Sequence, residues 1–170
     1  IVDVLVYTKD SFLELNSLNK GNMTLVNEEK ANKIYSSLGE GLQTSGGSVA
    51  NTLAGIALLG CKTGFIGRVK NDNLGEIFTK EIRGVGTIFE TPPTTSGPST
   101  ARCLILVTPD AERTMCTYLG ASVFLNSEDL NLSLIKESKI LYLEGYLFDS
   151  SEAKNAFYKS AKISKAHNKK

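Results

Sequence analysis

The chain has 170 residues, of which 41% are hydrophobic and 22% are charged, and its formal net charge is +1. These values are ordinary for a globular domain with a hydrophobic core, and they argue against a dedicated nucleic-acid surface, where a basic stripe is expected. No apolar run reaches the roughly 18 residues that a membrane-spanning helix needs. We therefore expect no nucleic-acid partner, no membrane partner and a cytoplasmic location.

The cysteine and histidine content argues against metal and redox sites. The three cysteines are scattered and form no C-x-x-C pair, which favours free thiols over a disulfide framework or a zinc site. The one histidine, His167, lies in a charged tail, so a histidine-based triad or metal site is excluded in practice. We assign no residue as a metal ligand.

The chain opens with an apolar, β-branched run, residues 1–7, that predicts a strand buried on both faces. Asp3 interrupts this run, and two interpretations stay open: a strand end that faces solvent, or a carboxylate aimed into a cleft to accept hydrogen bonds from ligand hydroxyls. A natural N-terminus rarely starts inside such a run, so we suspect that the start has been trimmed. The next predicted elements are a short helix or turn over 10–18, a strand over 22–26 and a helix over 27–38 capped by Asn27.

The rest of the chain is organised around residues 44–75. This stretch opens with Gly46-Gly47, which can reach backbone angles and close ligand approaches that other residues cannot. Ser48 is the predicted N-cap of a mostly apolar helix, and Asn51 lies one turn into it. Amides at the start of a helix beside a glycine turn suit a hydroxylated or anionic ligand.

Shorter elements lead to a proline-rich loop and a hairpin. Residues 63–66 predict a buried strand, Asp72 or Asn73 caps the following helix, and residues 87–90 predict a brief strand. Residues 91–99 contain Pro-Pro and Gly-Pro, which exclude a helix or central strand and indicate an exposed loop or hinge. Two strands, over 100–108 and 113–119, are joined by a Pro-Asp turn and predict a hairpin.

The last third is predicted to hold one strand and one long helix. Ser127 caps a short helical turn, residues 139–143 predict a buried strand, and Asp149 with Glu152 forms a capping-box-like pair before a helix over 151–166. Glu144 follows the strand, and either a pocket carboxylate or a solvated one fits that position. Alternating strands and helices predict an α/β fold built from βαβ units, with a mostly parallel sheet.

Two nucleotide-binding motifs are excluded by their positions. Gly55 to Gly60, followed by Lys62-Thr63, nearly spells a phosphate-binding loop, but Cys61 separates the glycine from the lysine. The glycines also fall within and after a helix, whereas such a loop precedes one. No Gly-x-Gly-x-x-Gly sequence follows the first strand, so a dinucleotide site is not expected.

The stretch 44–75 resembles the first signature of the ribokinase-like (PfkB) carbohydrate and nucleoside kinases. That signature has a Gly-Gly-x-small-x-Asn turn, a further Gly and a Gly-x-Val-Gly-Asp-Asp-like loop, which appear here at 46–51, Gly60 and 67–75. Val49, Leu53 and Lys70 depart from the pattern, whereas the order of elements on both sides agrees with it.

The resemblance implies that residues 1–170 are the N-terminal part of one ribokinase-like α/β domain. It implies a sheet flanked by helices and a small β-stranded lid, at approximately 8–26 and 88–119. The resemblance covers essentially all 170 residues, but only the front half of a family member. The Asn-x-x-Glu and Gly-Ala-Gly-Asp segments of the family's second half, with the aspartate that acts as general base, do not occur here. We therefore expect an incomplete N-terminal portion with little turnover of its own.

The resemblance also implies ATP-dependent phosphoryl transfer to a hydroxyl of a sugar or nucleoside, with Mg²⁺ and in some members a monovalent cation. Asp3 would accept hydrogen bonds from sugar hydroxyls, while the Gly46 and Gly47 amides and the Asn51 side chain add donors and an acceptor. Glu144 matches a further carboxylate near the sugar. Arg113 opens the second hairpin strand, where it would either swing toward the transferred phosphate on closure or remain merely solvated.

The branch of the family, the assembly state and the catalytic role of the chain stay open. Residues 107–122 look more like bacterial adenosine kinase and ribokinase-like members than fructokinases, and some family members form a homodimer through the lid. The alternative from another class is a non-catalytic binding or interaction module that retains only the sugar half of the fold.

Overall fold

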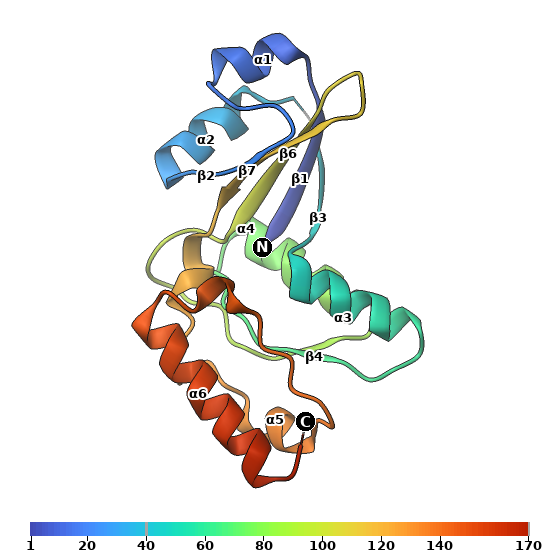
Figure 1. Cartoon of the computed structure of the whole chain (residues 1–170), viewed down its shortest axis with the longest axis vertical. Helices are drawn as coiled ribbons and strands as arrows, with labels where there is room; N and C mark the ends of the chain where they lie inside the picture. The colour runs from blue at the N-terminus through green and yellow to red at the C-terminus, as the bar shows by residue number, and fades with distance from the viewer. Residues whose placement is uncertain (40, 170) are drawn as a thin grey trace.

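The computed structural model of the protein describes residues 1–39 and 41–169 and arranges them in a mixed α/β fold (Figure 1). The strands are β1 (Val2–Tyr7), β2 (Met23–Leu25), β3 (Leu42–Ser45), β4 (Gly64–Phe65), β5 (Ile88–Phe89), β6 (Arg102–Val107) and β7 (Arg113–Tyr118). The helices are α1 (Asp10–Leu15), α2 (Glu28–Ser37), α3 (Ser48–Leu58), α4 (Asn73–Gly84), α5 (Leu132–Glu137) and α6 (Ser151–Ala166), with two 3₁₀ helices, η1 (Gly120–Phe124) and η2 (Gly145–Leu147).

Five strands form the main sheet, in the order β2-β7-β6-β1-β3, and β4 pairs with β5 in a smaller one. The pairs β1–β6, β2–β7 and β4–β5 are parallel, whereas β1–β3 and β6–β7 are antiparallel. Helices flank the sheets, with α1 at one end of the long axis and α6 at the other (Figure 1). The predicted α/β class with a mainly parallel sheet is therefore confirmed, and so is the hairpin of β6 and β7.

The hydrophobic core joins the main sheet to α4 and to the smaller sheet. Val2, Val4 and Val6 bury one face of β1, in a continuous cluster with Phe78 of α4. The rings of Phe65, Phe78 and Phe89, from β4, α4 and β5, lie with centroids 5.5–5.6 Å apart. The other face of β1, which carries Asp3, is only half-buried, so the prediction of a strand buried on both faces was too simple.

The turn of the β6–β7 hairpin is tied to the region around α1 by one lysine. The Nζ atom of Lys20 lies 2.6 Å from a carboxylate oxygen of Asp10 and 2.7 Å from one of Asp110. Asp110 also accepts a hydrogen bond from the Thr108 hydroxyl at 2.7 Å. These contacts link the hairpin tip to the segment that precedes β2.

Several helix boundaries follow the predicted capping residues. The Asn27 side chain accepts a hydrogen bond from the Lys30 amide at 2.9 Å, and Asp72 accepts one from the Gly75 amide at 2.8 Å. Helix α6 spans the predicted range, but its N-cap is Ser150, without a side-chain capping bond, so the proposed pair of Asp149 and Glu152 was wrong.

Two further predictions in the last third were wrong. Residues 139–143 do not form a strand, although their side chains are of the right type. A strand needs a neighbouring backbone to bond, and none of the described strands is paired with this segment. The short helix after Ser127 begins later, at Leu132, because Asn131 provides the cap and accepts from the Leu134 amide at 2.9 Å.

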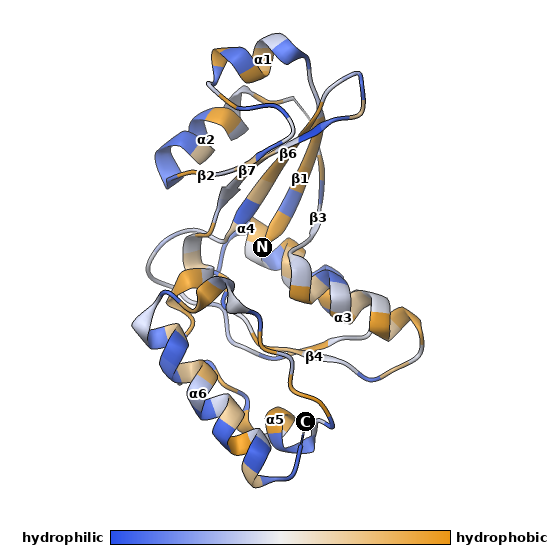
Figure 2. Ribbon diagram, in the orientation of Figure 1, coloured by the Kyte–Doolittle hydropathy of each residue, from blue (hydrophilic) through white to orange (hydrophobic). Residues whose placement is uncertain are grey.

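Apolar side chains remain exposed in two regions. Leu58 and Leu59 at the end of α3 are 77% and 85% exposed, and Ile140 is 69% exposed. Figure 2 shows these regions in orange, at the far end of α3 and along the segment that leads to η2. None of the described helices combines the length and the apolar character needed to cross a membrane.

Candidate functional site

Asp3 and the double-glycine turn lie against each other. Asp3 of β1 is paired across the sheet with Thr44 of β3, and β3 leads directly into Gly46. The Gly46 amide donates a hydrogen bond to the Ile1 carbonyl at 2.9 Å. A side-chain carbon added at Gly46 would lie 2.2 Å from the Asp3 carboxyl carbon, so only glycine allows this approach.

Gly47 starts α3 in a conformation that other residues rarely adopt. Its φ angle is +94°, and it is the N-cap of α3. The prediction that Ser48 caps this helix was therefore wrong: Ser48 is the first helical residue. No side chain caps α3, so the amides of its first turn keep no capping acceptor among the described residues.

Glu144 reaches the same helix start from the far end of the sequence. Because Ser48 is not the N-cap, its hydroxyl does not bond the helix backbone; it donates a hydrogen bond to the Glu144 Oε2 atom. Asn51 lies one turn further along, with an exposed side chain and with its own amide bonded to the Gly47 carbonyl at 2.9 Å. The structure thus gathers Asp3, the glycine turn and Glu144 around the start of α3.

The surroundings of Asp3 favour its protonated form. Burial raises the pKa of Asp3. Cys103, the parallel partner of Asp3 on β6, is buried, and burial raises the pKa of its thiol to about 11. A half-buried carboxylate without an ion pair to a described lysine or arginine is suited to accept hydrogen bonds from neutral hydroxyl groups.

Arg113 is not brought to this site. It is exposed at the start of β7, opposite Val107 and in line with Tyr7 of β1. Asp3 lies four positions back along β1, which corresponds to about 13 Å along the strand. The role of Arg113 in a closed state stays a prediction.

Two residues near Asp3 had no signal in the sequence. Thr44 and Cys103 flank Asp3 only because β3 and β6 pair with β1 in this register. Cys103 lies in a predicted strand with no feature that marks it for a site, and Thr44 lies where the sequence predicts no strand. A correct prediction of the strand order and register would have been needed to find them.

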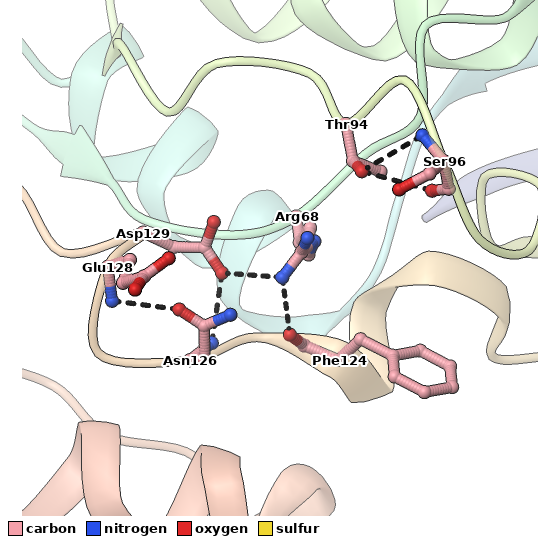
Figure 3. Close-up of polar contacts among 7 residues, drawn as sticks. All are labelled: Arg68, Thr94, Ser96, Phe124, Asn126, Glu128 and Asp129. Atoms are coloured by element: carbon pink, nitrogen blue, oxygen red, sulfur yellow. Dashed lines mark hydrogen bonds and ion pairs between the residues drawn. The ribbon is translucent and has the colours of Figure 1, made fainter.

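A separate pocket of about 500 Å³ lies beside Arg68, between the loop of residues 94–98, η1 and the start of α6. Figure 3 shows the Arg68 guanidinium pointing to the Phe124 carbonyl, 2.7 Å away, and to Asp129 Oδ2, 3.3 Å away. This pocket contains none of the predicted site residues. Because Asp129 balances the charge of Arg68, the pocket offers no free cation from that side chain.

The candidate site can bind hydroxyl groups through two carboxylates and a set of backbone amides. Across residues 1–39 and 41–169, no group of three or more His, Cys, Asp or Glu side chains could hold a metal ion. An α/β fold with a few polar groups converging at the start of a helix is typical of proteins that bind small molecules.

The comparisons with known proteins agree with this class. Residues 22–170 match the model of the pfkB family carbohydrate kinases, and the chain therefore belongs to that family. The 5-dehydro-2-deoxygluconokinase of Halalkalibacterium halodurans is 29% identical over 128 residues, which are 74% of this chain and 39% of the relative.

Two solved structures resemble the whole chain. The adenosine kinase from Sinorhizobium meliloti has a TM-score of 0.90 and 46% identity, over 100% of this chain and 52% of that one. A probable sugar kinase from Rhizobium etli has a TM-score of 0.90 and 43% identity, over 99% of this chain and 51% of that one. The ribokinase-like family prediction is confirmed, and the chain spans about half the length of these solved structures.

Proposed function

We propose that the whole protein is a kinase that transfers a phosphoryl group from ATP to a hydroxyl of a nucleoside or sugar. The portion described here would supply the acceptor pocket and the lid. The observation that carries the proposal is the contact between the Asp3 carboxylate and Gly46 at the uncapped start of α3. A nucleoside such as adenosine is the first candidate acceptor, because the adenosine kinase relative is 46% identical across the whole chain.

Each residue of the site has a role that its chemistry suits. Asp3 accepts hydrogen bonds from two adjacent hydroxyls of the acceptor, and the Gly47 amide donates to an oxygen of the acceptor. The Gly46 amide, also predicted as a donor, is already bonded to the Ile1 carbonyl. Asn51 offers an amide donor and acceptor from the first turn of α3. Glu144, oriented by Ser48, binds a further hydroxyl. Together these contacts fix the orientation of the acceptor, which is the main protein contribution in phosphoryl transfer.

ATP and Mg²⁺ would be held by the part of the protein that follows Lys170. When bound, Mg²⁺ neutralises charge on the transferred phosphoryl group. The described residues contain no metal-binding group, so the proposal assigns none of them to the metal or to a monovalent cation. The general base is likewise expected after Lys170, and a lid over 8–26 and 88–119, with Arg113, would exclude water on closure.

The test is an assay of ADP release by the full-length protein with ATP and Mg²⁺, screening adenosine, ribose, fructose and 5-dehydro-2-deoxygluconate. We expect turnover with one of these acceptors, adenosine first. An acceptor that binds in calorimetry but is never phosphorylated would support the non-catalytic module instead. Sedimentation of the same preparation tests the predicted homodimer through the lid.

A further inference from the structure

Glu81 of α4 bonds the strand end that carries the double-glycine turn. Its Oε2 atom accepts a hydrogen bond from the Thr44 hydroxyl at 2.8 Å and a second one from the Ser45 amide. Thr44 and Ser45 are the last two residues of β3, and Gly46 follows directly. One carboxylate oxygen, 36 residues away in sequence, thus holds both the side chain and the backbone at the entrance to the turn.

The Ser45 amide needs this acceptor because β3 is an edge strand. Among the described strands, the main sheet ends at β3, which pairs with β1 alone. The Gly46 amide points inward and bonds the Ile1 carbonyl at 2.9 Å. Because successive amides of a strand point in opposite directions, the Ser45 amide points to the open edge, where Glu81 meets it. The turn is therefore held on both sides, by Ile1 and by Glu81.

Helix α4 gives Glu81 a rigid support. Leu74, Phe78 and Ile82 bury one face of the helix in the core. The N-cap Asp72 also accepts hydrogen bonds from the amide of Thr100 at 2.9 Å and from its hydroxyl at 2.6 Å, which ties the helix to the start of β6. A binding group supported by a packed helix is held more accurately than one on a free loop.

We propose that Glu81 is a positioning residue of the acceptor site, which fixes the Gly46-Gly47 turn against Asp3 without touching the acceptor. The proposal rests on the proposed function. Thr44 is paired with Asp3 across the sheet, and a side-chain carbon added at Gly46 would overlap the Asp3 carboxyl, so the turn lies close to Asp3. A small shift of Thr44 and Ser45 therefore changes the distance between the Gly47 amide and Asp3, the two groups that hold the acceptor.

The test compares Glu81→Ala with Glu81→Gln in the full-length protein. Glu81→Ala removes the acceptor of both hydrogen bonds, and we expect the KM for the nucleoside or sugar to rise about 10-fold. The KM for ATP should stay within about twofold, because the contacts concern the acceptor side alone. Glu81→Gln keeps a carbonyl oxygen of the same reach, and we expect it to restore most of the acceptor KM.

Glu76→Ala is the matched control. Glu76 is an exposed glutamate in the first turn of the same helix, α4. Because it does not bond β3, its removal should leave the KM values for ATP and for the acceptor unchanged. Equal rises in the KM for ATP and for the acceptor, or no rescue by Glu81→Gln, would overturn the positioning role.

Hydrogen exchange provides a readout that is independent of turnover. In Glu81→Ala, the amides of Ser45 and Gly46 should exchange faster than in the wild type, while those of β6 keep their protection. If the wild type phosphorylates no acceptor, the proposed kinase function fails, and the exchange data still test the contact. Faster exchange with an unchanged acceptor KM would reduce Glu81 to a structural role. If Glu81→Ala does not fold, Thr44→Val removes one of the two donors and takes its place.

Discussion

Asp3 combines a favourable position for binding with an unfavourable one for stability. Its carboxyl contacts Gly46, and burial raises its pKa above the value it has in the unfolded chain. The ionised form is thus disfavoured in the folded protein. The contribution of Asp3 to the free energy of unfolding is greatest below its unfolded pKa, near 3.9, and is lost as the pH rises through the higher folded pKa.

Asp3→Asn should therefore separate stability from activity in the full-length protein. At pH 7 we expect a higher urea midpoint than in the wild type, because the buried charge is gone. We also expect kcat/KM for the acceptor to fall about 100-fold, because hydrogen bonds to a charged group are lost. Glu14→Gln, an exposed carboxylate on α1, is the control and should change neither value. An Asn variant with normal kinetics would remove Asp3 from the pocket.

Two glycines of the same region should respond in opposite ways to a methyl group. In Gly46→Ala the new carbon would overlap the Asp3 carboxyl, so we expect a loss of acceptor binding of about 100-fold. At Gly55, inside α3, nothing lies within 4 Å of the new carbon. Gly55→Ala should raise the free energy of unfolding by about 0.8 kcal/mol and leave binding unchanged. Calorimetric titration and urea unfolding of both variants check this, and equal effects would contradict it.

At the scale of the elements, the ion pairs of Lys20 stabilise the contact between the hairpin turn and α1. Hydrogen bonds from Lys20 and Thr108 lower the pKa of Asp110 to about 2. A carboxyl group whose pKa is lower in the folded protein than in the unfolded chain stabilises the fold at pH values above its unfolded pKa, near 3.9. This stabilisation is lost as the pH falls toward 2. The hairpin tip should therefore loosen over that acidic range.

Lys20→Ala should shift the titration of Asp110 upward, toward the ordinary aspartate value. A carbon-13 NMR titration of the Asp110 carboxyl in the wild type and the variant measures this shift. Lys9→Ala, an exposed lysine just before α1, is the control and should leave the titration where it is. An unchanged Asp110 pKa in Lys20→Ala would show that the contact does not persist in solution.

The elements that the sequence predicted well are those with local signals. The capping side chains of Asn27 and Asp72 and the turn at Pro109-Asp110 act within a few residues, so they can be read along the chain. Strand β3 was missed, because Leu42–Ser45 shows no alternation and becomes a strand only through its pairing with β1. The strand predicted over residues 139–143 was wrong for the opposite reason: the segment has an apolar pattern but no partner strand among the described residues.

The same distinction holds for the site. Gly46-Gly47 and Asp3 could be chosen from residue type and family resemblance. The bonds of Ser48 to Glu144 and of Glu81 to β3 join residues 96 and 36 positions apart, and no spacing along the chain indicates them. Ser48 was predicted to be the helix cap because serine is favoured at N-cap positions. In the structure Gly47, with its positive φ angle, is the N-cap, so the helix begins at Ser48 itself.

At the scale of the whole molecule, stability depends on the core between the two sheets. Phe78 is fully buried between Phe65 and Phe89, so Phe78→Ala should lower the free energy of unfolding by about 3–5 kcal/mol. Ile140, which is 69% exposed, is the control, and Ile140→Ala should change it by less than about 0.5 kcal/mol. Urea unfolding of the 170-residue chain measures both. Similar losses in the two variants would contradict the described packing.

The position of Ile1 has a practical consequence for anyone who attaches something to this polypeptide. Its carbonyl accepts the Gly46 amide, and a methyl group added at Gly47 would overlap the Ile1 side chain. Whatever is joined directly ahead of Ile1, whether natural sequence, purification tag or fluorophore, must therefore leave from beside the Gly46-Gly47 turn. In Figure 1 the C-terminus lies near one end of the long axis, whereas Ile1 lies near its middle. For binding measurements on the 170-residue chain, attachment after α6 therefore keeps the added group away from Ile1.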